Sequence, residues 1–302
     1  MLPGREGRRM DGAANAYDRA AESIGNSVEL QHVNLRVPDQ QAATAFYISG
    51  LGLTRDPFLM AGTDNMWANA GAGQFHLPTG APQVLRGVTG LVVPDRAQLL
   101  ERLARVRGQL EGTRFAFAET EDGAEATCPW GNRIRCHAPD AARFGPITLG
   151  IPYVEFDVPP GTTGGIARFY REIIGAPAWT EDGGRAARSL VAKDQHLVFR
   201  ETERPLPPFD GHHVQIALAD FGGPYAKLRE RGLVSREDNR WQYRFRDIVD
   251  LDTGAVLFTV EHEVRSMTHP MFGRPLVNRN AAINNRNYAP GHEAWAWAMP
   301  PR

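Results

Sequence analysis

The pattern of apolar and polar residues predicts four copies of one strand, helix and strands unit. Residues 30–53 (LQHVNLRVPDQQAATAFYISGLGL) recur as 151–176 (IPYVEFDVPPGTTGGIARFYREIIGA), and weaker copies occupy 86–108 and 211–233. Each copy opens with apolar and polar residues in alternation, which is typical of a half-buried strand, and continues into an amphipathic helix that ends at glycine. Short strand-like runs follow each helix until the next copy begins.

These units also predict how the chain is divided. One unit has a single apolar sheet face and cannot enclose a core alone, so the units are expected to pair. We predict a first two-unit domain at residues 28–140 and a second at 147–265. Residues 1–27 are expected to form a mobile N-terminal arm. Residues 266–302 are rich in Asn and Pro without periodicity, and we expect them to wrap around the domains or act as a lid.

Composition narrows the class of protein. The 302 residues suffice for about two domains, and 42% hydrophobic with 23% charged residues is typical of a globular protein. With 34 Lys and Arg against 35 Asp and Glu, and without a basic stripe, we expect no nucleic-acid partner. We also expect no membrane segment and no signal peptide. Only two cysteines, Cys128 and Cys136, occur, which favours a reducing compartment and a cytoplasmic location.

Two histidines occupy the same place in the first and fourth copies. Alternate residues of a strand point to opposite faces, so the apolar Val33 and Val214 are expected to face the helix. That arrangement turns His32 and His213 to the opposite, concave face. A single strand histidine is more often an ordinary polar residue, but the agreement of two copies favours metal ligands.

The closing strands of the same two copies carry further ligand types. His76 lies 44 residues after His32, and Glu261 lies 48 residues after His213. Three imidazoles and one carboxylate form a nitrogen and oxygen set suited to Zn, Ni, Co, Fe or Mn. The predicted metal ligands are therefore His32, His76, His213 and Glu261, with Glu261 also the candidate catalytic base.

The register of the last strand leaves alternatives open. Glu263 lies on the same strand face as Glu261, and counting from the turn at 252–254 places Phe258 at the ligand position. Three residues are expected as polar neighbours on the same faces: Asn34, Gln74 and Gln215.

The second and third copies lack such a ligand set. Val88 and Tyr153 stand at the place of His32, Arg135 closes the second copy, and His196 has no partner on its first strand. No metal is expected there. The remaining histidines are expected at the surface or in loops: His137, His212, His262, His269 and His292.

The sequence HVNLRVPD followed by AFY and GLGL, repeated along residues 28–265, resembles the vicinal oxygen chelate superfamily. That superfamily includes glyoxalase I, extradiol dioxygenases and bleomycin-resistance proteins. The resemblance implies an α+β fold of four βαβββ units paired into two cup-shaped mixed sheets. It also implies a divalent metal held inside a cup by residues of the first and last strands of both units.

The resemblance implies a pairing of units as well. The ligand distribution would require units one and four to share one cup, leaving units two and three to build a metal-free cup. In the alternative, neighbouring units pair and each cup holds a half-site, which a homodimer would complete by exchanging units.

Three functions follow from the resemblance. The first is a metal-dependent lyase or isomerase that moves a proton on a substrate chelated through two adjacent oxygens, because four protein ligands leave two open positions. The second is an Fe(II)-dependent extradiol-type dioxygenase, which uses two histidines and one carboxylate. The third is a metal-free small-molecule binding or resistance protein. The lyase or isomerase function has one mismatch with the family, because the resemblance implies a carboxylate in glyoxalase I at the position where this chain has His76.

Overall fold

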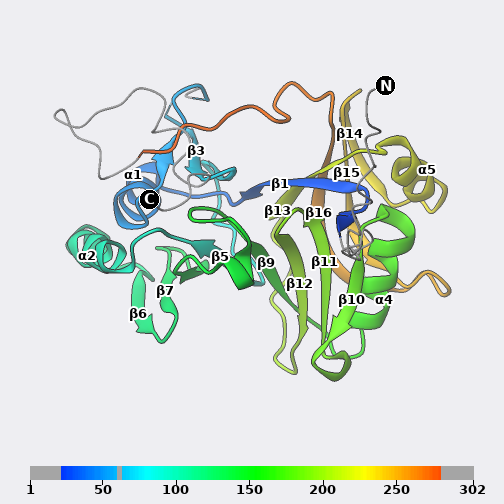
Figure 1. Ribbon diagram of the computed structural model, residues 1–302, viewed down its shortest axis with the longest axis horizontal. Helices are drawn as coiled ribbons and strands as arrows, with labels where there is room; N and C mark the ends of the chain where they lie inside the picture. Colours follow the sequence, from blue (N-terminus) through cyan, green and yellow to red (C-terminus); the bar gives the residue numbers. More distant parts are fainter. Residues whose placement is uncertain (1–21, 60–62, 280–302) are drawn as a thin grey trace, which may run out of the picture.

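The computed structural model describes residues 22–59 and 63–279, which form two eight-stranded mixed sheets (Figure 1). Each of the four units contains a first strand, a helix and three further strands. The α+β class and the pairing of four βαβββ units into two sheets are therefore confirmed. Within the described residues, no helix is long and apolar enough to cross a membrane.

The first sheet combines units one and four, in the strand order β14-β15-β16-β13-β1-β4-β3-β2. Its centre is the antiparallel pair β1 and β13, and β4 and β16 run parallel to them on either side. The alternative pairing of neighbouring units is wrong. The strands are β1 (Ser27–Asn34), β2 (Thr54–Arg55), β3 (Asn65–Ala70), β4 (Gly73–Pro78), β13 (His213–Leu218), β14 (Val234–Asn239), β15 (Gln242–Val249) and β16 (Val256–Ser266).

The second sheet combines units two and three in the order β10-β11-β12-β9-β5-β8-β7-β6, with β5 antiparallel to β9 at its centre. The two sheets thus have the same plan. The strands are β5 (Gly87–Val92), β6 (Ala116–Thr120), β7 (Gly123–Thr127), β8 (Arg133–His137), β9 (Tyr153–Val158), β10 (Ala178–Glu181), β11 (Ala186–Ala192) and β12 (Gln195–Glu201).

A helix follows the first strand of each unit, and two short helices, α3 (Ala141–Phe144) and η5 (Asp182–Gly184), lie between other strands. The helices after the first strands are α1 (Gln40–Ala43) continued by the π-helix η2 (Thr44–Gly50), α2 (Arg96–Val106) with η3 (Arg107–Leu110), α4 (Thr163–Phe169) with η4 (Tyr170–Ile174), and α5 (Gly222–Glu230). Aspartates after the first strands start two of them: Asp39 accepts from two backbone amides of α1, and Asp95 accepts from one of α2.

The helices group the units differently from the sheets, because the helices of units one and two lie together, as do those of units three and four (Figure 1). In Figure 1, α1 and α2 lie at one end of the molecule and α4 and α5 at the other. At the first end, Gly50 packs so closely on α2 that an added Cβ would lie 3.3 Å from Val106. At the other, Lys227 donates to the backbone of Glu172. The division at residues 28–140 and 147–265 agrees with this helix packing but is crossed by both sheets, and it stays a prediction.

The core lies between the sheets and the helices and extends through all four units. The Phe-Tyr pairs of the two strong copies, Phe46-Tyr47 and Phe169-Tyr170, are all fully buried. Burial of each such ring contributes about 1.5–3 kcal/mol. The alternation that predicted the first strands is confirmed, because Val33 and Val214 are buried in this core.

The described part of the C-terminal tail runs from β16 across to β3 (Figure 1). Arg274 forms an ion pair of 2.7 Å with the buried Asp56, and Asn278 bonds in both directions with the backbone of Gly71. The tail therefore lies along units one and four at the first sheet. Its role as a lid stays a prediction, and residues 1–21 and 280–302 lie outside the described residues.

Candidate metal site in the first cup

Three histidines meet on the concave face of the first sheet. The ring centroids of His32 and His213 lie 5.6 Å apart, and those of His32 and His76 also lie 5.6 Å apart. His32 and His213 are buried and His76 is half-buried. They converge because β1 and β13 are neighbours and because alternate residues of each strand face the same side.

The strand register relates the closing strands of the two units. His76 is aligned with Asn34 on β1, and Glu263 is aligned with Gln215 on β13. Asn34 and Gln215 each lie two residues after the histidine of their strand, so Glu263 is the counterpart of His76. Glu261 is aligned with His213 itself, as Gln74 is with His32, so Glu261 is the counterpart of Gln74.

Ligand atoms of His32, His213 and Glu263 all lie within 4.8 Å of one another, so this group could hold a metal ion. Nε2 of His213 lies 3.4 Å from Oε2 of Glu263. Neither ring nitrogen of His32 has a hydrogen-bond partner among the described residues, although the ring is 1% exposed. Buried nitrogens without partners are costly, so the His32 ring is open to a ligand, and a metal fits the donor set.

His76 lies beside this group with its ring engaged elsewhere. The ring stacks on Trp67 at a centroid distance of 3.7 Å and an interplanar angle of 12°. Its Nε2 lies 2.7 Å from Oδ1 of Asn65. His76 is therefore a neighbour of the three-residue group, and its role as a ligand stays a prediction.

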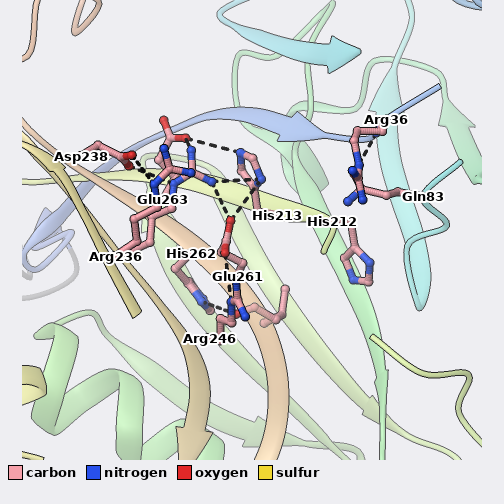
Figure 2. Close-up of polar contacts among 12 residues, drawn as sticks. Arg36, Gln83, His212, His213, Arg236, Asp238, Arg246, Glu261, His262 and Glu263 are labelled. Carbon is pink, nitrogen blue, oxygen red and sulfur yellow. Dashed lines mark hydrogen bonds and ion pairs between the residues drawn. The ribbon is translucent and has the colours of Figure 1, made fainter. Parts of the chain in front are cut away.

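Glu261 is held by two arginines. Its Oε1 accepts from Nη1 of Arg244 at 2.6 Å, and its Oε2 accepts from Nε of Arg246 at 3.1 Å. Figure 2 shows Glu261 and Glu263 both directed toward His213. The 3.6 Å between Glu261 Oε1 and His213 Nδ1 is too long for a hydrogen bond. Its roles as ligand and base stay predictions, and the geometry places it outside the ligand group.

Two arginines that the sequence analysis missed surround Glu263. Arg244 donates to Glu263 as well as to Asp238, and Arg265 lies 2.6 Å from Oε1 of Glu263. Arg265 also donates to Gln31 at 2.7 Å. Arg244 is preceded on β15 by Gln242, two positions away, and this alternation of polar residues was the signal that could have placed it on the concave face.

The protonation states suit metal binding, because neutral imidazoles and ionised carboxylates are the ligand forms. Burial holds the pKa of His32 well below its ordinary value and lowers the pKa of His213 despite the nearby carboxylates. Burial, with His213 nearby, lowers the pKa of His76 to about 3. Burial alone would raise the pKa of Glu263, but its contacts with His213, His32 and Arg265 lower it.

Gln215 adds an unsatisfied polar group to the same face. Its side chain is fully buried, and neither its amide nitrogen nor its amide oxygen has a partner among the described residues. It lies opposite His32 in the strand register. The amide is therefore available to a bound molecule in the cup.

Of the histidines expected at the surface or in loops, His137 and His262 are buried on strands, which corrects that expectation, while His212 lies in the loop before β13. His262 is completely buried on the helix side of β16, where it stacks on Phe245 and bonds to the Tyr170 hydroxyl at 2.7 Å. His212 is fully buried and His137 is 2% exposed. His292 lies outside the described residues.

The second cup has different residues at the corresponding register positions. Tyr153 stands at the place of His32, as expected, and Arg135 is aligned with Gly90 as Glu263 is with Gln215. His196 is aligned with Tyr153 as Gln74 is with His32, so His196 matches Gln74 of the first cup. Val198 is aligned with Glu155, two residues further along β9, and therefore matches His76. The described residues of this cup form no group of three metal-ligand types.

Four βαβββ units paired into two mixed sheets are the arrangement that the resemblance to the vicinal oxygen chelate superfamily implied. The resemblance seen in the sequence is confirmed at the level of the fold. No protein-family model matches the sequence, and no curated protein matches it.

Among solved structures, the chain is similar to glyoxalase I from Zea mays, with 14% identity and a TM-score of 0.52, over 80% of this chain and 93% of that chain. It is equally similar to a protein of Bacillus subtilis subsp. subtilis str. 168 named as a candidate dioxygenase, with 17% identity and a TM-score of 0.52, over 81% and 86% of the chains. At such identities the likeness concerns the fold.

Proposed function

We propose that the first cup is a divalent-metal centre of an enzyme that binds its substrate through two adjacent oxygens, with an oxygenase reaction of the extradiol type. The observation that carries this proposal is the ligand group of His32, His213 and Glu263. Two histidines and one carboxylate with open positions are the ligand set of non-haem Fe(II) oxygenases.

Fe(II) at this group would act as a Lewis acid toward two substrate oxygens and leave a further position for O2. The protein's own residues complete the cup. Because neither polar atom of the Gln215 amide has a partner in residues 22–59 and 63–279, the amide offers a donor and an acceptor to a substrate oxygen or hydroxyl group. Arg244 and Arg265 hold the Glu263 carboxylate in place, as outer partners of metal ligands commonly do.

A lyase or isomerase is the second candidate, and His76 is the observation that favours it. His76 occupies the register position of Glu263 in unit one, and its ring lies 5.6 Å from that of His32. Rotation away from Trp67 and Asn65 would supply a fourth ligand, which leaves only the two positions that a bidentate substrate needs.

The test is anaerobic titration of the metal-depleted protein with Fe(II), followed by oxygen uptake with catechol as the probe. We expect one Fe(II) per chain and catechol-dependent oxygen consumption. His32→Ala should weaken Fe(II) binding by more than the roughly 10- to 100-fold that loss of an outer hydrogen-bond partner costs. The matched control is His196→Ala in the second cup, which should bind Fe(II) as the wild type does.

His76→Ala separates the two candidates. Unchanged Fe(II) affinity in this variant supports three ligands and the oxygenase. A large loss of Fe(II) affinity in this variant, together with a wild type that consumes no more oxygen when catechol is added, supports the isomerase. Failure of the wild type to bind Fe(II), Zn, Ni, Co or Mn would contradict both and favour a metal-free binding protein.

A further inference from the structure

The second cup contains a cavity of about 440 Å³ on the concave face of its sheet. This volume lies within the range of small-molecule sites, about 300–1,000 Å³. The lining residues combine two cations, polar groups, the aromatic rings of a phenylalanine and a tyrosine, and one aliphatic side chain: Arg143, Phe144, Tyr153, Glu155, Arg188, His196 and Val198. The residues between the two predicted domains thus contribute Arg143 and Phe144 to this wall.

The floor of the cavity is built around the Tyr153 ring. Gly90 on the neighbouring strand leaves room for it, because an added Cβ there would lie 2.5 Å from the ring. The Tyr153 hydroxyl lies 2.8 Å from Nε2 of His137, whose Nδ1 lies 3.3 Å from Asp122. This chain of contacts fixes the ring where His32 stands in the first cup.

Two guanidinium groups face the cavity from different elements. Arg143 is anchored to Asp122 at 2.9 Å, and Arg188 is anchored to Glu181 through its Nε at 2.8 Å. Each anchor fixes one side of the guanidinium fork, which has five donors in all. A planar fork of this kind recognises a carboxylate better than a lysine does.

The single carboxylate of the lining does not neutralise these two groups. Glu155 lies 3.3 Å from Arg200 and 3.9 Å from Arg135, both outside the lining. Its charge is compensated by these two arginines, just as Asp122 and Glu181 outside the lining compensate Arg143 and Arg188. An anionic ligand would therefore be recognised by the remaining donors of the Arg143 and Arg188 guanidinium groups, which each have five in all.

We propose that the second cup is a metal-independent binding site for a small carboxylate with a flat apolar body. The carboxylate binds between Arg143 and Arg188, and the apolar body lies against Phe144 and Tyr153. This site is separate from the proposed metal centre and shares with it one register position, because Tyr153 stands where the first cup has His32.

The test uses benzoate as the probe and isothermal titration calorimetry of the full chain in EDTA. We expect saturable binding of benzoate in the millimolar range or below, and none of the neutral isostere benzamide. Arg188→Gln and Arg143→Gln should each weaken binding about tenfold or more, because each removes a charge-assisted hydrogen bond. Thermal unfolding of each variant reports whether it remains folded.

Two matched controls locate the site. Arg105→Gln removes an exposed arginine of α2 that lies outside the cavity lining and contacts none of it, and His32→Ala disables the metal centre, so both should bind benzoate within twofold of the wild type. Absence of saturable binding at millimolar benzoate, equal binding of benzamide, or loss of binding in His32→Ala would each overturn the proposal.

Discussion

The two cups share one backbone plan and differ in the side chains at four matched positions. The first cup has His32, His76, His213 and Glu263 at these positions. The second cup has Tyr153, Val198, Val88 and Arg135. Paired sheets therefore fix where a ligand can be held, while the residues at these positions decide which chemistry is available.

The charge of the two cups is also arranged in opposite ways. In the first, the Glu263 carboxylate is 3% exposed and lies between the guanidinium groups of Arg244 and Arg265. In the second, the Arg135 guanidinium lies 3.9 Å from both Glu125 and Glu155 and is about a third exposed. The ion pairs of Glu263 thus form a buried network, whereas those of Arg135 are long, partly exposed and screened by solvent.

The largest expected effect breaks this contrast in charge. Glu263→Ala leaves Arg244 and Arg265 without their shared buried partner and should lower the free energy of unfolding of the metal-depleted protein by about 3–5 kcal/mol. The matched change in the second cup, Arg135→Ala, should cost only about 0.2–1 kcal/mol, because its ion pairs are long and partly exposed. Urea unfolding measures both.

A similar cost for the two variants would contradict the contrast. Glu263→Gln serves as the conservative control, because it keeps the shape and one acceptor oxygen, and it should fall between the wild type and Glu263→Ala. If Glu263→Ala is as stable as the wild type, water replaces the carboxylate and the network is not a buried one.

The placement of the first-strand histidines could be predicted from the sequence, because the period of two in a strand is a local property. Val33 and Val214 are in the core, and His32 and His213 meet on the other face. The pairing of the outer units was one of the two alternatives that the sequence left open, and the distribution of ligand types between the copies was the argument for it.

Whether Glu261 or Glu263 is the counterpart of His76 could not be predicted from the sequence alone. The spacing from first strand to matched position is 44 residues for His76 and 50 for Glu263, because unit four has longer closing strands and connections. Counting residues therefore favoured Glu261, whereas only the parallel register of β13 and β16 aligns Glu263 with Gln215. A similar limit applies to His262, which was expected at the surface or in a loop but is buried against Tyr170 from another unit.

A second, smaller effect concerns pH and compares one histidine of each cup. Burial lowers the pKa of His76 to about 3 and that of His196 to about 4, against about 6.5 for a free imidazole. Below pH 6.5 the unfolded chain binds a proton that the folded protein does not, so these groups make stability fall as the pH falls. Above pH 6.5 both states are neutral and the effect vanishes.

Removing either histidine should make this dependence shallower. His76→Gln and His196→Gln should each reduce the slope of unfolding free energy against pH by up to about 1.4 kcal/mol per pH unit between pH 6.5 and the folded pKa. Urea unfolding of the metal-depleted protein between pH 7.5 and roughly pH 4.5 measures the slope. A slope identical to that of the wild type would mean that the folded protein also binds this proton.

The smallest effect concerns Gln215, whose counterpart in the second cup is Gly90. Because both polar atoms of its buried amide lack partners among the described residues, Gln215→Met should stabilise the metal-depleted protein by about 1 kcal/mol. The exposed Gln98→Met is the matched control and should stay within about 0.5 kcal/mol of the wild type. In the Fe(II)-loaded protein, Gln215→Met should instead weaken catechol binding, because the substrate loses the amide. Destabilisation by Gln215→Met in the metal-depleted protein would show that the amide is satisfied without a substrate, and the difference between the cups would then rest on the metal ligands alone.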